Sequence, residues 1–186
     1  LRAEAEVPQA RLAGRGRQLA GRTGCGLCGV ETITEALRDL RTVVWREPVD
    51  PAALWRAESE LGARQEYNRA TGAMHAAAWA TWDGAIRVAR EDVGRHNALD
   101  KVLGALARQS LDPRDGFLVM TSRASYELVQ KATVAGVPLL AAVSRPTGLA
   151  IRLADAAGLT LVGLLRGHTA NVYTHPEHIR SAAVAL

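Results

Sequence analysis

The chain has 186 residues, 48% of them hydrophobic, and a formal net charge of +4 at pH 7. This length and apolar content suit one domain with a hydrophobic core and exclude a chain that is disordered over most of its length. The small charge comes without a basic run interleaved with aromatic residues, which disfavours a nucleic-acid-binding protein. Apolar stretches such as 137–143 are too short to span a bilayer and no signal segment opens the sequence, so we expect a soluble cytoplasmic protein without a membrane partner.

The first feature along the chain is a glycine-rich segment that contains its two cysteines. It reads Gly24-Cys25-Gly26-Leu27-Cys28-Gly29 and follows Arg22 closely. Two cysteines cannot form the disulfide framework of a small secreted protein, and the Cys-x-x-Cys spacing indicates redox, metal or sulfur chemistry. The glycines favour a mobile loop, and the nearby arginine favours a thiolate. Such a thiolate can attack a sulfane sulfur and hold it as a persulfide.

Two other interpretations of the cysteine pair stay open. Half of a structural zinc site has the same spacing, although the sequence offers neither a second Cys-x-x-Cys nor a His-x(3–5)-His pair. A thioredoxin-like dithiol also has this spacing, but it would lie between an early strand and its helix, whereas Cys25 and Cys28 precede the whole predicted βα core. Spacing alone does not decide between them.

Beyond the cysteines, segments with the pattern of helices alternate with segments typical of strands. Pro51 stands at a first helical position after Asp50, and Leu54 and Leu61 recur on one side of the helix that begins there. Asp83-Gly84 joins two extended segments, as in a β-hairpin. The predicted helices cover 31–40, a segment beginning at Asp50-Pro51, 94–109, 125–135 and 147–157. The predicted strands cover 76–82, 85–90, 117–120, 137–143, 159–165 and 171–173.

The alternation over 116–165 predicts an α/β fold with a largely parallel sheet and helices on both faces. The hairpin adds an antiparallel pair, so the sheet is mixed. The helix at 94–109 carries an apolar stripe for packing, made of Leu99, Val102, Leu103 and Leu106. Ligands of such sheets bind at the carboxyl ends of the strands. We therefore expect the polar segments that follow three strands to converge there, namely 121–123, 144–147 and 166–168.

His96 and the hydroxyl groups near this edge have two interpretations each. His96 either is a core histidine that hydrogen-bonds Asp100 one turn later, or faces a ligand from the start of its helix. The hydroxyls at 121–125 either cap the next helix or form an anion pocket, and those at 144–147 raise the same choice. His75 directly precedes the first strand of the hairpin. Two such loops at neighbouring strand ends favour a ligand site.

Five sequence blocks, in a fixed order, are similar to those of a known family. They are CGLCG at 25–29, TGAMHAA at 71–77, EDVGRHNALDK at 91–101, TSRASYELVQK at 121–131 and NVYTHP at 171–176. The block at 91–101 is highly specific, whereas the cysteine motif alone is not. On these blocks, which are spread along residues 22–176, the chain resembles the FdhD family of formate dehydrogenase accessory sulfurtransferases.

The resemblance implies a cytidine-deaminase-like three-layer α/β core and a sulfurtransferase that works as a persulfide carrier. Cys25 would accept sulfur from a cysteine desulfurase, with Cys28 as its companion in relay or protection. The acceptor would be the molybdenum bis(molybdopterin guanine dinucleotide) cofactor of formate dehydrogenase, and the protein would have no catalytic metal of its own. The residues implied to bind this cofactor and its guanine nucleotide are Leu164, Leu165, Arg166, Gly167, His168 and Thr169, with His75, His96, Ser122 and Ser144 nearby.

The chain also departs from the family pattern. We expect a first segment, 1–30, that carries the mobile cysteine loop, and a cofactor-binding core at 31–186, with the family's N-terminal domain largely absent. Deaminase chemistry is disfavoured because His75-Ala76-Ala77 lacks the glutamate of His-x-Glu and no Pro-Cys-x-x-Cys follows. We expect a homodimer. The alternative function is a chaperone module that is stabilised by zinc or binds a guanine nucleotide without transferring sulfur.

Overall fold

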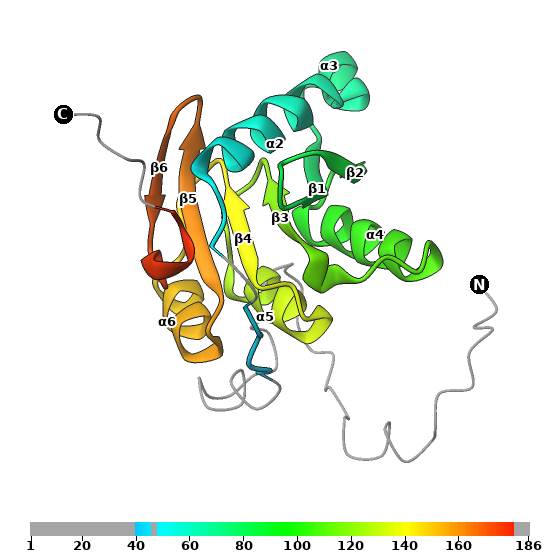
Figure 1. Ribbon diagram of the computed structural model, residues 1–186. Coiled ribbons are helices and arrows are strands. Elements are labelled where there is room, and N and C mark those ends of the chain that lie inside the picture. Colours follow the sequence, from blue (N-terminus) through cyan, green and yellow to red (C-terminus); the bar gives the residue numbers. More distant parts are fainter. Residues whose placement is uncertain (1–39, 46–47, 181–186) are drawn as a thin grey trace, which may run out of the picture. The chain divides into compact units, whose positions relative to one another are not determined.

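A mixed sheet of six strands forms the centre of the computed structural model, which describes residues 40–45 and 48–180 (Figure 1). The strand order is β2-β1-β3-β4-β5-β6. β3, β4 and β5 are parallel, whereas β1 is antiparallel to β2 and β3, and β6 is antiparallel to β5. The strands are β1 (His75–Thr81), β2 (Ile86–Asp92), β3 (Gly116–Met120), β4 (Leu139–Ala142), β5 (Thr160–Arg166) and β6 (Thr169–Val172). The predicted mixed α/β fold is confirmed.

Five α-helices accompany the sheet in the described residues: α2 (Pro51–Ala63), α3 (Glu66–Thr71), α4 (Arg95–Arg108), α5 (Tyr126–Ala135) and α6 (Gly148–Ala157). Short 3-10 helices lie at Pro113–Asp115 and Pro176–His178. The sequence predicted all of the α-helices except α3. The cysteine loop and residues 31–39 of the predicted first helix lie outside the described residues. No helix in the described part of the chain is long and apolar enough to cross a membrane.

Both faces of the central strands are buried, which requires helices on both sides of the sheet. On one face, α2 packs against β1, β2, β3 and β5. Its buried residues Ala53, Leu54, Ala57 and Leu61 belong to the same core cluster as alternate residues of β1, β3 and β4. The intervening residues of the same strands, among them Trp79, are also buried. That second face is covered by α4 against β1 and β2, by α5 against β4 and by α6 against β5. The molecule therefore has the three layers expected from the sequence.

The hairpin between β1 and β2 depends on Gly84. The turn is closed by the bond from Thr81 N–H to the carbonyl of Ala85, 3.0 Å long. Gly84 has a φ of +85°, a region that favours glycine. A Cβ atom there would also lie only 2.3 Å from the carbonyl oxygen of Ala53 in α2. The glycine therefore permits both the turn and the close approach of α2.

The segment before α2 is tied to the other end of the described chain. We call residues 43–45 and 48–49 the strap. Val43 N–H donates to the carbonyl of Ala157, and Trp45 Nε1–H donates to the carbonyl of Gly158. Val49 pairs in parallel with Ile179. These contacts hold the strap against the junction between α6 and β5 and against the segment that follows β6.

Candidate functional site

The loops that follow β3, β4 and β5 form one continuous surface at the carboxyl edge of the sheet. Thr147 N–H donates to the carbonyl of Ala124 over 3.0 Å, which joins the 121–125 loop to the 143–147 loop. Leu164 N–H donates to the carbonyl of Ser144 over 3.3 Å, which joins the 143–147 loop to the 164–169 turn. The predicted convergence of three polar segments is confirmed. The start of β1 and the first turns of α4 and α5 lie at the same edge.

Residues on α4 and α5 meet through His96. Its Nε2 atom lies 3.3 Å from Ser125 Oγ and 3.6 Å from Glu127 Oε2. The side chains of His96 and Glu127 are 23% and 12% exposed, so the contact is largely shielded from water. Asp100 instead accepts from Lys131 Nζ. The interpretation of His96 as a core histidine bonded to Asp100 is therefore wrong, because the ring points across to the start of α5.

The two histidines of this edge have lowered pKa values. Burial is the main cause for the pKa of His96, and the nearby Glu127 carboxylate only partly opposes it. Burial also lowers the pKa of His75, and the positive charge of Arg95 adds to the effect. Both rings are therefore held towards their neutral forms, which can accept as well as donate a hydrogen bond.

The first turn of α4 is fixed by Asp92 at the end of β2. Its Oδ1 atom accepts from Gly94 N–H over 2.9 Å and from the Asn97 side chain over 3.2 Å. The ion pair with Lys101 is the main reason why the pKa of Asp92 falls to about 2. This carboxylate thus fixes the turn that leads into α4, the helix that carries His96.

Two buried polar atoms beside His96 lack a hydrogen-bond partner among the described residues. They are Nε of Arg95, a donor, and Oε1 of Glu127, an acceptor. Most buried polar atoms in proteins are paired, and the exceptions call for water or a ligand. Neither Arg95 nor Glu127 is among the residues that the sequence predicts for the site. Both lie in the blocks quoted above, and their place in the first turns of two predicted helices was the available signal.

The serines of the site differ in role. Ser122 is 3% exposed, and its hydroxyl donates to the carbonyl of Arg123. Ser125 precedes α5 without a capping bond from its side chain, so the capping interpretation is wrong for the 121–125 loop. Thr147 does cap α6, accepting from Ala150 N–H over 3.2 Å. Ser144 meets the 164–169 turn through its carbonyl oxygen.

The 164–169 turn exposes residues 166–169 to solvent and buries the side chain of Leu165. Leu164 has a φ of +54°, rare for a residue other than glycine, where the pairing of β5 with β6 shifts in register. Leu165 is fully buried in the core on the α2 side, so a ligand could meet only its backbone. The exposed residues are Arg166, Gly167, His168 and Thr169. The His168 ring meets the ring of Trp55 edge-on, with 5.0 Å between centroids.

One exposed arginine stands on each of the three joined segments: Arg123, Arg145 and Arg166. None of them forms an ion pair with another described residue. One guanidinium group can donate two parallel hydrogen bonds to the oxygens of one phosphate group. The surface therefore suits an anionic ligand with several phosphates.

Two cavities of the described chain lie away from this surface. One, of about 1040 Å³, follows the outer edge of β2 and is lined by Tyr67, Arg90 and Arg108 among others. The other, of about 510 Å³, lies between the strap and the hairpin turn, beside Arg56 and Trp82. None of the residues predicted to bind the cofactor lines either cavity. We place the candidate site at the loops because the unpaired buried atoms and the arginines are there.

Comparison with known proteins identifies relatives along nearly the whole chain. The family model described as FdhD/NarQ matches residues 2–180. The sulfur carrier protein FdhD of Bordetella petrii is 53% identical over 171 residues, which are 92% of this chain and 62% of that protein. The sulfur carrier protein FdhD of Xanthomonas campestris pv. campestris (strain B100) is 52% identical over 177 residues, 94% of this chain and 63% of that protein.

A solved structure supports the same relationship. The crystal structure of a candidate formate dehydrogenase accessory protein from Desulfotalea psychrophila matches with a TM-score of 0.72 and 28% sequence identity, over 78% of this chain and 62% of that one. The chain thus spans less than two thirds of the length of each of these three proteins. Because the family match covers both cysteines and all the loops described above, the chain belongs to the FdhD/NarQ family.

Proposed function

We propose that this chain carries sulfur on Cys25 and delivers it to a molybdenum cofactor. In this proposal a cysteine desulfurase supplies the sulfur, and the acceptor is a bis(molybdopterin guanine dinucleotide) cofactor destined for formate dehydrogenase. The observation that carries the proposal is the family match over residues 2–180, which includes Cys25 and Cys28, together with relatives that are named sulfur carrier proteins. The proposal extends to a homodimer, which light scattering of the purified chain would test.

The loading step needs no outside oxidant. The Cys25 thiolate attacks the terminal sulfur of a persulfide on the donor enzyme. A new S–S bond forms as the old one breaks, and the donor cysteine leaves as a thiolate. The sulfur is therefore already at the oxidation level that a persulfide requires. Cys28 would be able to shield or relay it, since it lies only three residues further along the chain.

The described residues would contribute the docking surface for the acceptor. Arg123, Arg145 and Arg166 suit the diphosphate groups of a dinucleotide cofactor. The unpaired Nε of Arg95 and Oε1 of Glu127 would add a donor and an acceptor for polar groups of the ligand. The His96 ring, whose lowered pKa favours the neutral form, contacts both Glu127 and the Ser125 hydroxyl. The site would therefore bind by charge at its rim and by hydrogen bonds at its centre.

Intact-protein mass spectrometry tests the sulfur step. After incubation with a cysteine desulfurase and cysteine, the unmodified chain should gain the mass of one sulfur atom, and a reducing thiol should remove it. Cys25→Ala should abolish the gain, whereas Cys28→Ala is the matched control and should keep at least part of it. A gain that survives in Cys25→Ala would overturn the assignment.

Two other outcomes would support the alternative functions. One tightly bound zinc that depends on both cysteines, with thiols that resist alkylation, would indicate a zinc-stabilised module. Affinity for guanosine diphosphate without any persulfide would indicate a guanine-nucleotide-binding module instead.

A further inference from the structure

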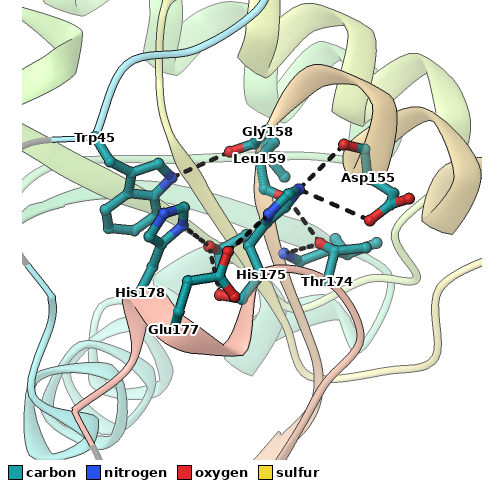
Figure 2. A network of polar contacts seen from close by, with 10 residues as sticks. Trp45, Asp155, Gly158, Leu159, Thr174, His175, Glu177 and His178 are labelled. Carbon is teal, nitrogen blue, oxygen red and sulfur yellow. Dashed lines mark hydrogen bonds and ion pairs between the residues drawn. The ribbon is translucent and has the colours of Figure 1, made fainter.

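A cluster of metal-binding residue types lies in the segment that follows β6, away from the loops of the candidate site. His175, Glu177 and His178 each offer one ligand atom, and these atoms lie within 4.8 Å of one another. In the described residues this is the one group of three or more His, Cys, Asp or Glu side chains with such spacing. Figure 2 shows the cluster between Trp45 of the strap and Asp155 of α6. Nothing in the proposed function uses these residues.

The surroundings of His175 place a hydrogen-bond acceptor against each of its ring nitrogens. Nε2 lies 3.1 Å from the carbonyl oxygen of Asp155, which can only accept a hydrogen bond. Nδ1 lies 3.1 Å from Oε1 of Glu177, an ionised carboxylate that also only accepts. With one ring proton committed to Asp155, the lone pair of Nδ1 would face the carboxylate and repel it. A second proton or a metal ion at Nδ1 resolves the conflict.

His178 is held in place by Thr160 and Trp45. Thr160 Oγ1 donates to the carbonyl of His175 and lies 3.0 Å from Nδ1 of His178. The threonine therefore accepts from Nδ1–H when the His178 ring is neutral. Trp45 stacks on this ring, with 4.1 Å between centroids and 23° between planes. Both partners hold the ring in place, as outer partners of metal-binding histidines do.

We propose that His175, Glu177 and His178 bind a divalent transition metal such as Zn²⁺. Imidazole nitrogen and carboxylate oxygen are typical zinc ligands, and metal–ligand lengths of about 2.0–2.1 Å put neighbouring ligands roughly 3.3 Å apart. His175 Nδ1 and Glu177 Oε1 already have nearly this separation. The Asp155 carbonyl would be the outer partner that sets the His175 tautomer.

The backbone brings the three ligands together. His175 has a φ of +51° and a ψ of +57°, so the chain turns back at once into the 3-10 helix Pro176–His178. Just before it, Thr174 is 4% exposed and bonds to both the carbonyl of Leu159 and the N–H of Leu161. The site is thus anchored to the start of β5. A bound ion would fasten His178, and through it Trp45, so metal would stabilise the strap.

Binding of Co²⁺ to a chain without cysteines tests the proposed site. We would use the untagged full-length chain with Cys25→Ala and Cys28→Ala, because thiolates also bind zinc. One equivalent of Co²⁺ should bind, with visible absorption of a low-coordinate ion, and Zn²⁺ should displace it. Glu177→Gln and His178→Gln should each weaken binding by about 10-fold or more. Zn²⁺ should raise the unfolding temperature of the parent but not of Glu177→Gln, whose side chain is 62% exposed and should not be needed for folding.

His168→Gln is the matched control, since it removes an exposed histidine elsewhere and should leave Co²⁺ binding unchanged. Two results would overturn the proposal. One is no Co²⁺ binding beyond that of a His175→Gln/His178→Gln double variant, in which case a proton supplies the charge at His175. The other is an equal loss in His168→Gln, which would indicate nonspecific chelation. Neither result bears on persulfide formation at Cys25, so failure here is separate from failure of the proposed function.

Discussion

Oε2 of Glu127 lies 3.6 Å from Nε2 of His96, and each residue is the second of its helix. The contact therefore joins the starts of α4 and α5, the positive ends of both helix dipoles. Helix N-termini attract negative charge. The Glu127 carboxylate suits this position, and its second oxygen remains without a partner among the described residues.

Glu127→Gln should lower the pKa of His96 further. The carboxylate is the group that opposes the effect of burial on this ring, and the isosteric amide removes its charge but keeps its size. An NMR titration of the His96 imidazole signals measures the change. Asp100→Asn is the control: Asp100 pairs with Lys131 rather than His96, so a larger shift in that variant than in Glu127→Gln would contradict the assignment.

The chain should lose stability as the pH falls below about 6.5, the usual histidine value. The pKa values of His75 and His96 are lower in the folded state than in the unfolded state. Between the folded and the unfolded pKa values, the unfolded state therefore binds more protons. Stability is then full above pH 6.5 and falls as the pH drops towards the folded values. Arg95 and Lys131 add to the shift and Glu127 opposes it.

Urea unfolding at pH 7.5 and pH 5.5 measures this effect. The difference between the two pH values should be smaller in a His75→Gln/His96→Gln variant than in the unmodified chain. At pH 8 the rings are neutral in both the folded and the unfolded state. The difference in unfolding free energy between the variant and the unmodified chain at this pH therefore measures any loss of packing. An unchanged difference would mean that these two rings do not carry the pH dependence.

Gly84→Ala should destabilise the fold by about 2 kcal/mol or more, because it combines a positive φ with a Cβ that meets the α2 backbone. Gly104→Ala is the matched control. Its Cβ would meet nothing within 4 Å, and it lies inside α4, so the change should stabilise by roughly 0.5–1 kcal/mol. Thermal and urea unfolding of both variants give the comparison, and equal effects of the same sign would refute it.

Loss of single arginines should weaken binding of guanosine diphosphate, the probe for the cofactor's nucleotide. Arg123→Gln, Arg145→Gln and Arg166→Gln should each reduce affinity by about 5- to 10-fold, as expected for one charge-assisted contact of roughly 1 kcal/mol. The control is Arg87→Gln, an exposed residue near the start of β2, at the opposite edge of the sheet. Calorimetry at two salt concentrations should show a weaker salt dependence in the three variants only.

The sequence predicted those parts of the fold that local signals determine. Asp50-Pro51 begins α2, Asp83-Gly84 forms the turn between β1 and β2, and the convergence of three loops follows from the βα alternation. α3 escaped prediction because its six residues are too few to show a helical period.

The partners of His96 could not be predicted from spacing. Asp100 lies one turn away on the same helix, but its carboxylate bonds Lys131 of α5 instead. The choice depends on how α4 and α5 pack, which no local pattern encodes. Leu164 is a similar case, since a leucine in a left-handed conformation is stabilised only by its surroundings. The same holds for the His175 cluster, whose ligands are adjacent in sequence but are oriented by Thr160, Asp155 and Trp45.

The parallel pairing of Val49 with Ile179 brings the two ends of the described core together. Val49 N–H donates to the carbonyl of His178, and Arg180 N–H donates to the carbonyl of Val49, each over 2.9 Å. The two ends of the sheet-forming chain thus lie side by side, the arrangement that tolerates circular permutation. A short peptide joining 180 to 48, with new termini opened at the exposed 108–110 turn, should leave the strand order intact. If it does, contacts between these elements, rather than their order along the chain, determine the fold.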